Sequence, residues 1–100
     1  MYVRLNMFSV GSGQRAQFER LADQFAPIFK AQKGFQSVTF FEADAAAGEY
    51  GSFSLWDTRE DAEAADAALM PQLRQAVSGL GVQMQGTPIR RIGEAYEPKA

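Results

Sequence analysis

The feature that most restricts the fold is a pair of segments that alternate between two kinds of face. In residues 2–10 one set of alternate positions is apolar, the other set mixes polar and aromatic side chains, and residues 49–56 repeat this split. The apolar positions are Val3, Leu5 and Met7 in the first segment and Phe53 and Leu55 in the second. Strict alternation is typical of β-strands. Because neither segment has a purely polar face, we expect both faces of the sheet that they form to be covered.

Two helices are predicted between the strands. In residues 14–33, apolar side chains recur at spacings of three and four, as on the buried face of a helix, and Gly34 suits the position just after its end. A second helix is predicted from the capping pattern of Thr58 and Asp61 through the alanine-rich run to Leu69.

Each predicted helix has a proline in or next to it. Pro27 lacks the backbone N–H that a helix interior needs, so we expect it to kink or divide the first helix. Pro71 is expected to follow the end of the second helix and to open a new segment that runs to Ser78.

The remaining strands complete the order of elements. Residues 35–44 and 82–92 are predicted as strands, the latter irregular, with residues 45–48 as a hairpin loop and a terminal arm after Glu94. The order strand–helix–strand–strand–helix–strand, with right-handed crossovers, gives an α+β fold of the ferredoxin-like βαββαβ type. This fold is an antiparallel four-stranded sheet with two helices on one face. At this length we expect a single domain over residues 1–100.

The composition excludes several classes of protein. The chain has no Cys and no His, which removes a thiolate nucleophile, a Cys-based metal site and an imidazole base. Its 10 basic and 12 acidic residues nearly balance, so nothing indicates a surface for nucleic acid. No apolar stretch approaches the ~20 residues of a membrane helix, and no signal peptide is evident. We therefore expect a cytoplasmic protein that binds neither nucleic acid nor membrane.

The sheet face opposite the helices carries the apolar positions of both alternating segments. Soluble monomers generally avoid an exposed apolar patch of that size. A second copy of the same sheet is the simplest cover, because most homo-oligomers are two-fold symmetric and one patch then meets itself. We predict a homodimer through sheet-to-sheet packing.

Three local motifs carry a resemblance to a known family. A strand containing Asn6 leads into a glycine-containing turn, Lys33-Gly34-Phe35 opens the second strand, and residues 55–62 (LWDTREDA) join a strand ending in Trp to an acidic, capped helix. In these motifs, and in element order over nearly the whole chain, the sequence resembles the dimeric α/β-barrel superfamily, most closely its antibiotic-biosynthesis-monooxygenase-like group. The resemblance implies a dimeric α/β barrel. It also implies kinship with cofactor-independent oxygenases of aromatic or quinol compounds, with haem-degrading enzymes, and with members that have no assigned activity.

The resemblance implies two catalytic residues. In several enzymes of the family, an Asn on the first strand and a Trp at the end of the third line a cleft between sheet and helices, and Asn6 and Trp56 match these positions. An amide offers both a donor and an acceptor to a substrate oxygen, and an indole can stack on a planar ring. The alternative is that Asn6 bonds to backbone groups and Trp56 fills the core.

Further residues are candidates for substrate binding. They are Arg4, Phe8, Phe25, Phe29, Ser54 and Arg90. The arginines suit an anionic substrate edge or a phenolate, and alternatively a surface salt bridge; the phenylalanines suit a substrate wall, and alternatively the core. Ser52 and Ser54 have no His partner that could activate a hydroxyl, which excludes a serine hydrolase. Tyr2 and Tyr50 suit rim positions, where a phenol can also orient a substrate oxygen.

No cofactor and no metal is expected. Haem-degrading relatives hold iron through a His on the second helix, and residues 64–70 contain none. The acidic residues of the hairpin, Glu42, Asp44 and Glu49, are interpreted as a solvated turn rather than a cation site. The leading hypothesis is a cofactor-independent monooxygenase for a small aromatic or quinol-type compound, whose own anion reduces O2. A non-catalytic ligand-binding or stress-associated protein and a dimerisation module are the alternatives.

Overall fold

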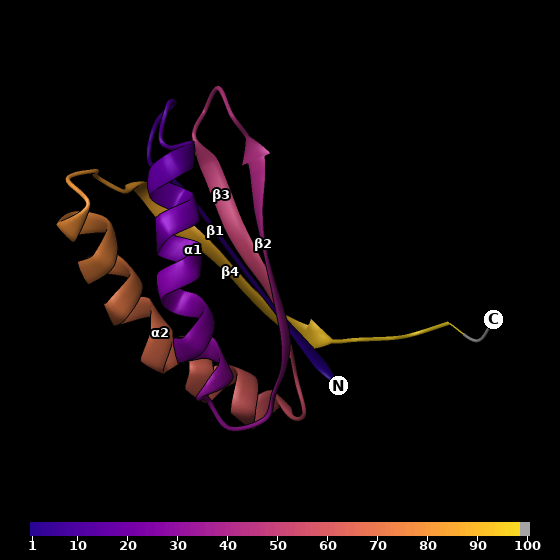
Figure 1. Cartoon of the computed structure of the whole chain (residues 1–100). Coiled ribbons are helices and arrows are strands. Elements are labelled where there is room, and N and C mark those ends of the chain that lie inside the picture. Colours follow the sequence, from indigo (N-terminus) through magenta and orange to yellow (C-terminus); the bar gives the residue numbers. More distant parts are fainter. Residues whose placement is uncertain (99–100) are drawn as a thin grey trace.

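The computed structural model describes residues 1–98 and contains one four-stranded sheet and two helices (Figure 1). The elements are β1 (Tyr2–Ser9), α1 (Arg15–Lys30), β2 (Phe35–Asp44), β3 (Glu49–Trp56), α2 (Arg59–Gly79) and β4 (Gln85–Glu94). This is the predicted βαββαβ order, so the ferredoxin-like α+β fold class is confirmed.

The first strand lies inside the sheet, where it pairs with strands on both sides. The strand order is β2-β3-β1-β4, and all neighbouring pairs are antiparallel. In the register of β1 with β3, Leu5 faces Phe53 and Asn6 faces Ser52. Both helices cover the same face of the sheet (Figure 1). The predicted pairing of the first and third strands is confirmed, and it brings their polar and aromatic positions onto one wall.

The alternation in β1 separates a buried face from an open one. Arg4, Asn6 and Phe8 are buried on the face that the helices cover, whereas the residues between them are only partly buried. On the helix-free face, Phe53 of β3 keeps 42% of its surface exposed. The predicted division into two faces is correct. Within the described residues, the apolar face has no covering element.

Local signals define the start of α2 and the turn that precedes β2. The Oγ1 of Thr58 accepts a hydrogen bond from the backbone N–H of Asp61 at 3.1 Å, which confirms the predicted cap. Gly34 has a φ of +80°, and a Cβ there would overlap the Asp61 carboxylate. The carbonyl of Gly34 also accepts a hydrogen bond from the N–H of Asp57 at 2.9 Å. A glycine is therefore required where this turn meets α2.

Both prolines lie inside continuous helices, so the predicted division at Pro27 and at Pro71 is wrong. Helix α1 continues through Pro27 and ends at Lys30, short of the predicted Lys33, and α2 continues through Pro71 to Gly79. Both prolines are exposed. The carbonyl that each leaves without an N–H lies on the same helix face, where water can satisfy it.

The last strand is displaced from its predicted bounds of residues 82–92 to Gln85–Glu94. Its register with β1 shifts between Met7 and Ser9, which confirms the predicted irregularity. After Glu94, residues 95–98 leave the sheet as an extended arm (Figure 1), as predicted. Residues 99 and 100 of that predicted arm lie outside the described residues.

Candidate functional site

A small cavity lies between the sheet and the two helices. Its volume is about 20 Å³, enough for roughly one water molecule. Strands β1 and β3 supply its floor and the helices supply its roof. The lining residues are Arg4, Asn6, Phe8, Phe18, Leu21, Phe25, Phe29, Phe40, Gly51, Ser52, Leu69 and Leu73. The predicted position of the cleft, beneath the helices on the polar and aromatic face, agrees with this cavity.

Asn6 presents an unpaired amide oxygen inside the protein. The residue is 4% exposed and lines the cavity. Its Oδ1 is buried and has no hydrogen-bond partner among the described residues. Folded proteins pair nearly all buried polar atoms, because an unpaired one costs about 1–3 kcal/mol. The interpretation that Asn6 merely satisfies backbone groups does not account for this oxygen.

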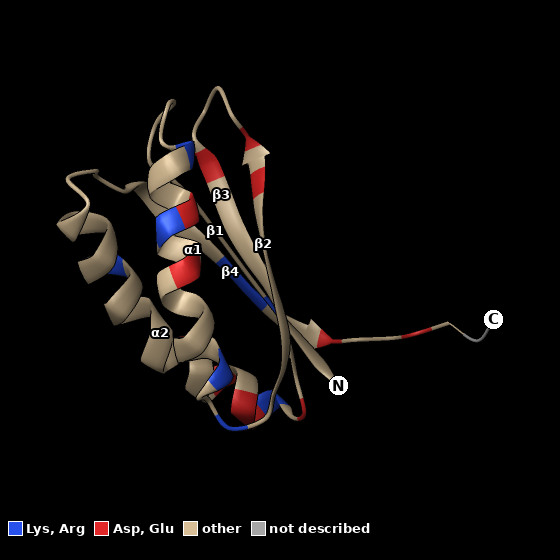
Figure 2. Cartoon of the chain, in the orientation of Figure 1, with Lys and Arg blue, Asp and Glu red and all other residues tan. Residues whose placement is uncertain are grey.

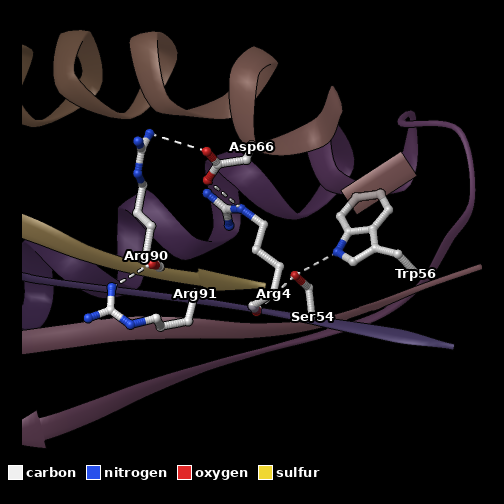
Figure 3. A network of polar contacts seen from close by, with 6 residues as sticks. All are labelled: Arg4, Ser54, Trp56, Asp66, Arg90 and Arg91. Carbon is white, nitrogen blue, oxygen red and sulfur yellow. Dashed lines mark hydrogen bonds and ion pairs between the residues drawn. The ribbon is translucent and has the colours of Figure 1, made fainter. Parts of the chain in front are cut away.

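An ion cluster built around the buried Arg4 borders the cavity beside Asn6. The Nε of Arg4 donates a hydrogen bond to Oδ1 of Asp66 at 2.9 Å, and Nη1 of Arg90 lies 3.2 Å from Oδ2 of the same carboxylate (Figure 3). Burial lowers the pKa of the Arg4 guanidinium, and the Asp66 carboxylate opposes that shift. Two guanidinium groups share one carboxylate, so the cluster keeps a net positive charge next to the cavity.

The two arginines occupy different places in this cluster. Arg4 lines the cavity with a side chain that is 2% exposed, whereas the side chain of Arg90 on β4 is 47% exposed and does not line it. Arg90 reaches the site only through Asp66. Elsewhere in the described chain, basic and acidic residues are interspersed along α1, one basic position lies within α2, and others lie near the ends of the elements (Figure 2). Arg4, at 1% exposure, is the most deeply buried charged residue that the structure describes, and Asp61, at 9%, is the other buried one.

Trp56 and Ser54 lie behind the cavity wall. Trp56 is fully buried, and its Nε1 donates a hydrogen bond to Oγ of Ser54 at 2.9 Å (Figure 3). The Ser54 hydroxyl in turn donates to the backbone carbonyl of Arg4 at 3.4 Å. The indole ring packs against Phe29 and Phe35, at centroid distances of 6.4 and 5.7 Å. Neither Trp56 nor Ser54 is among the lining residues; both support residues that are.

The predicted phenylalanines form the aromatic part of the wall. Phe8, Phe25 and Phe29 all line the cavity, and the Arg4 guanidinium lies 5.9 Å from the centroid of the Phe29 ring. All three also belong to the hydrophobic core. The two interpretations of this stripe, core and ligand wall, therefore describe the same side chains.

The two tyrosines lie away from this wall. Tyr50 stacks on Phe18 at 4.4 Å, and burial, with the nearby Glu42 carboxylate, raises the pKa of its phenol. Tyr2 is the first residue of the inner strand β1, and its hydroxyl donates to Glu94 at 3.2 Å. Neither residue lines the cavity.

Sequence reasoning missed Asp66, whose carboxylate joins the arginines. The signal is its place on α2: Ala62, Asp66 and Leu69 recur at spacings of four and three, so an acid stands within the buried stripe of the helix. An acid in such a stripe indicates a cationic partner on the facing element. Ser52, which alternation places on the same strand face as Ser54 and Trp56, does line the cavity, whereas the lining residue Leu73 was not proposed as a site residue.

Within residues 1–98, no group of three or more acidic residues lies together in a way that could hold a metal ion. Glu42 of the hairpin instead pairs with Arg15 at 3.1 Å. No helix in the described part of the chain is long and apolar enough to cross a membrane.

The fold and the site define a small ferredoxin-like α+β protein with a positively charged, polar and aromatic cavity beneath its helices. The chain belongs to the antibiotic biosynthesis monooxygenase family, whose sequence model matches residues 1–78. A search of curated proteins by sequence finds no match.

Solved structures of similar fold include two described as oxygenases. SnoaB, a cofactor-independent oxygenase from Streptomyces nogalater, is 20% identical with a TM-score of 0.68 over 97% of this chain and 94% of that chain. The ActVA-Orf6 monooxygenase of Streptomyces coelicolor, in complex with nanaomycin D, is 18% identical with a TM-score of 0.74 over 99% of this chain and 90% of that chain. A protein of unknown function from Nitrosomonas europaea is 13% identical with a TM-score of 0.75 over 99% and 92%. At these identities the likeness establishes the fold alone.

Proposed function

We propose that this protein is a cofactor-independent monooxygenase that acts on a small aromatic or quinol-type compound. The observation that carries the proposal is the buried, unpartnered Oδ1 of Asn6 on the wall of a cavity that Arg4 also lines. Membership of the family supports the reaction class. The similar folds of SnoaB, described as a cofactor-independent oxygenase, and of ActVA-Orf6, solved with nanaomycin D, support the absence of a cofactor and an aromatic type of substrate.

The residues of the wall suit a substrate that reacts as its anion. The Oδ1 of Asn6 accepts a hydrogen bond from a substrate hydroxyl, and the net positive cluster around Arg4 stabilises negative charge that develops on the ring system. Asp66 holds the Arg4 guanidinium in place before the substrate arrives, and burial of Arg4 strengthens its electrostatic effect. Stabilising the anion also lowers the pKa of the bound substrate.

The reaction needs no reductant other than the substrate. An activated methylene group of an aromatic ketone loses a proton to water, the resulting carbanion gives one electron to O2, and the two radicals combine into a peroxide anion that takes a proton back from water. The peroxide loses water and leaves a carbonyl, so that one methylene group and one dioxygen molecule give one carbonyl group and one water molecule. One oxygen atom enters the product and the other leaves as water. Within this scheme Asn6 and Arg4 touch the substrate anion, while Trp56 is a positioning residue that holds Phe29 and, through Ser54, the backbone of Arg4.

The cavity has to enlarge before a ring can enter. Its volume of about 20 Å³ fits one water molecule, not an aromatic ring. Phe25 is the side chain best placed to yield, because it also lines an outer groove between α1 and α2, together with Gln24 and Gln72. Rotation of Phe25 joins this groove to the cavity.

The proposed enzyme is a homodimer that packs sheet against sheet. The helix-free face carries Leu5, Phe53 and Ile89, of which Phe53 and Ile89 are 42% and 44% exposed. Each Å² of apolar surface that the contact removes from water stabilises the dimer by about 25 cal/mol. A stable pair of this kind buries on the order of 2,000 Å² in total.

Oxygen uptake with anthrone and with hydroquinones tests the proposal. We expect uptake with at least one of them, with one product carbonyl formed per O2 consumed when anthrone is the substrate. Asn6→Ala is expected to lower kcat/KM about 10- to 100-fold, because a buried anchor contributes ~1–3 kcal/mol. Ser37→Ala, on an exposed strand position, is the matched control for expression and folding. Uptake by Asn6→Ala at the parent rate contradicts the proposal.

Trp56→Phe separates positioning from contact. It keeps most of the packing against Phe29 and removes the hydrogen bond to Ser54. We expect a rise in KM with kcat within about threefold, because the indole does not line the cavity. A loss of kcat as large as that of Asn6→Ala contradicts the positioning role and assigns Trp56 to the reacting centre.

Ligand binding without turnover is the second candidate function. The observation that favours it is the composition of the wall: the cavity's lining residues include no carboxylate and no imidazole that can take a proton from a bound ligand. A protein that binds anthrone through Asn6 but consumes no O2 has this second function.

A further inference from the structure

The unpaired amide oxygen of Asn6 has a counterpart at the start of α1. Gln14 is the residue that precedes α1, and its Oε1 is buried without a hydrogen-bond partner among residues 1–98. Its side chain makes no capping hydrogen bond to the helix. In the described part of the chain, these two amide oxygens are the only buried side-chain polar atoms left unpaired.

Gln14 lines a second cavity, of about 10 Å³, that adjoins the first. Its other walls come from the end of β1, the start of α1, the end of α2 and the segment that follows α2. They include Val10, Gln17, Val77, Leu80 and Val82. Phe8, Phe18 and Leu21 line both cavities and form the partition between them.

The two cavities follow one another along the inner face of β1. Asn6 lines the first cavity, Val10 lines the second, and Phe8 between them lines both. At about 3.3 Å per residue, Asn6 and Val10 lie roughly 13 Å apart along the strand. A ligand that occupies both cavities therefore has a length on the order of 10 Å, about that of two aromatic rings.

We propose that the two cavities are the halves of one binding site and that Gln14 is its second polar anchor. The ligand class is an elongated, largely apolar compound with a hydroxyl group at each end. One hydroxyl donates to Oδ1 of Asn6 and the other to Oε1 of Gln14, while the aromatic partition rotates to admit the rings between them. This inference rests on the proposed function and deepens it, because it gives the substrate a length and two polar ends.

The test compares two ligands that differ by one hydroxyl. 4-Hydroxybiphenyl and 4,4′-dihydroxybiphenyl have the same two rings, and isothermal titration calorimetry gives the ratio of their dissociation constants. With the unmodified protein, we expect the dihydroxy compound to bind about 5- to 20-fold more tightly, a gain that includes about twofold from its symmetry. In Gln14→Leu the ratio falls to about two, and the affinity for 4-hydroxybiphenyl stays within about twofold.

Gln83→Leu is the matched control. Gln83 is exposed and lines neither the two cavities nor the outer groove between α1 and α2, so the same substitution there leaves the ratio unchanged. Asn6→Ala weakens both ligands, because each uses that anchor. The thermal midpoint of every variant, read by circular dichroism, shows that the binding data come from folded protein.

Several outcomes overturn the inference. They are a ratio of two or less in the unmodified protein, no binding of either ligand, and an unchanged ratio in Gln14→Leu. Oxygen uptake keeps the two proposals apart. A ratio that depends on Gln14 without oxygenation of any compound supports the two-cavity site and overturns the monooxygenase. If oxygenation depends on Asn6 but the ratio of dissociation constants is the same in Gln14→Leu, only the role of Gln14 as second anchor is overturned.

Discussion

Asp66→Ala measures how strongly one carboxylate holds a buried charge in this protein. Asp66 accepts a hydrogen bond from Nε of Arg4 at 2.9 Å and lies 3.2 Å from Nη1 of Arg90. The side chain of Arg4 is 2% exposed and that of Arg90 is 47% exposed, so the two contacts contribute unequally to the free energy of unfolding. Without Asp66, the Arg4 charge stays buried with no counter-charge, and we expect the free energy of unfolding to fall by ~3–5 kcal/mol. Arg90→Ala removes only the exposed contact and costs ~0–1 kcal/mol.

Urea denaturation followed by circular dichroism gives these free energies, and a domain of this size has ~5–15 kcal/mol to lose. The double variant Arg4→Met/Asp66→Leu removes both charges. It should recover most of the stability that Asp66→Leu loses, because apolar residues often replace a buried pair at little cost. The reasoning is refuted by a cost below ~1 kcal/mol for Asp66→Ala, or by equal costs for Asp66→Ala and Arg90→Ala.

Two more predictions address the open sheet face and the buried phenol. Leu5→Glu should convert the proposed dimer to monomer or aggregate in light scattering, because it places a charge in the proposed sheet-to-sheet contact. The exposed substitution Lys30→Glu should not have this effect, and a dimer that tolerates Leu5→Glu assigns the contact to another surface. Burial, then Glu42, raises the pKa of Tyr50, so its contribution to stability is complete below about pH 10 and is lost as the pH rises through the folded-state value. The urea midpoint of the parent should therefore fall more than that of Tyr50→Phe between about pH 8 and about pH 10.5, and parallel falls would contradict this sign.

The fold follows from patterns that act over short distances. Alternation in residues 2–10 and 49–56 identified both faces of the sheet, and the Thr58 cap fixed the start of α2. Pro27 and Pro71 misled because a proline removes a single N–H, a loss that water offsets at an exposed position. The rule that proline interrupts a helix considers only the local sequence, and the exposure of each proline is known only from the folded structure.

The candidate site was predictable where a single strand or a single helix carries it. Arg4, Asn6 and Phe8 share a face of β1, so their common wall followed from period-two alternation. The contact of Asp66 with Arg4 joins residues 62 positions apart and depends on how α2 rests on the sheet. The place of Trp56, behind the wall rather than in it, depends in the same way on side-chain packing around Phe29.

The uncapped start of α1 makes one end of the cavity roof easier to open than the other. Gln14 gives the helix no side-chain cap, its first turn has no acidic residue, and the ion pair of Arg15 with Glu42 there is partly exposed. Helix α2, by contrast, starts at the Thr58 cap and is bound to the sheet through Asp66. Backbone amide hydrogens in the first turn of α1 should therefore exchange with solvent through brief local fraying, whereas those of α2 should exchange only when a larger part of the protein unfolds. Because the fraying end is the one beside Gln14, we expect it to give oxygen and small molecules a second route into the interior, separate from the groove at Phe25 and away from the charged cluster at Arg4.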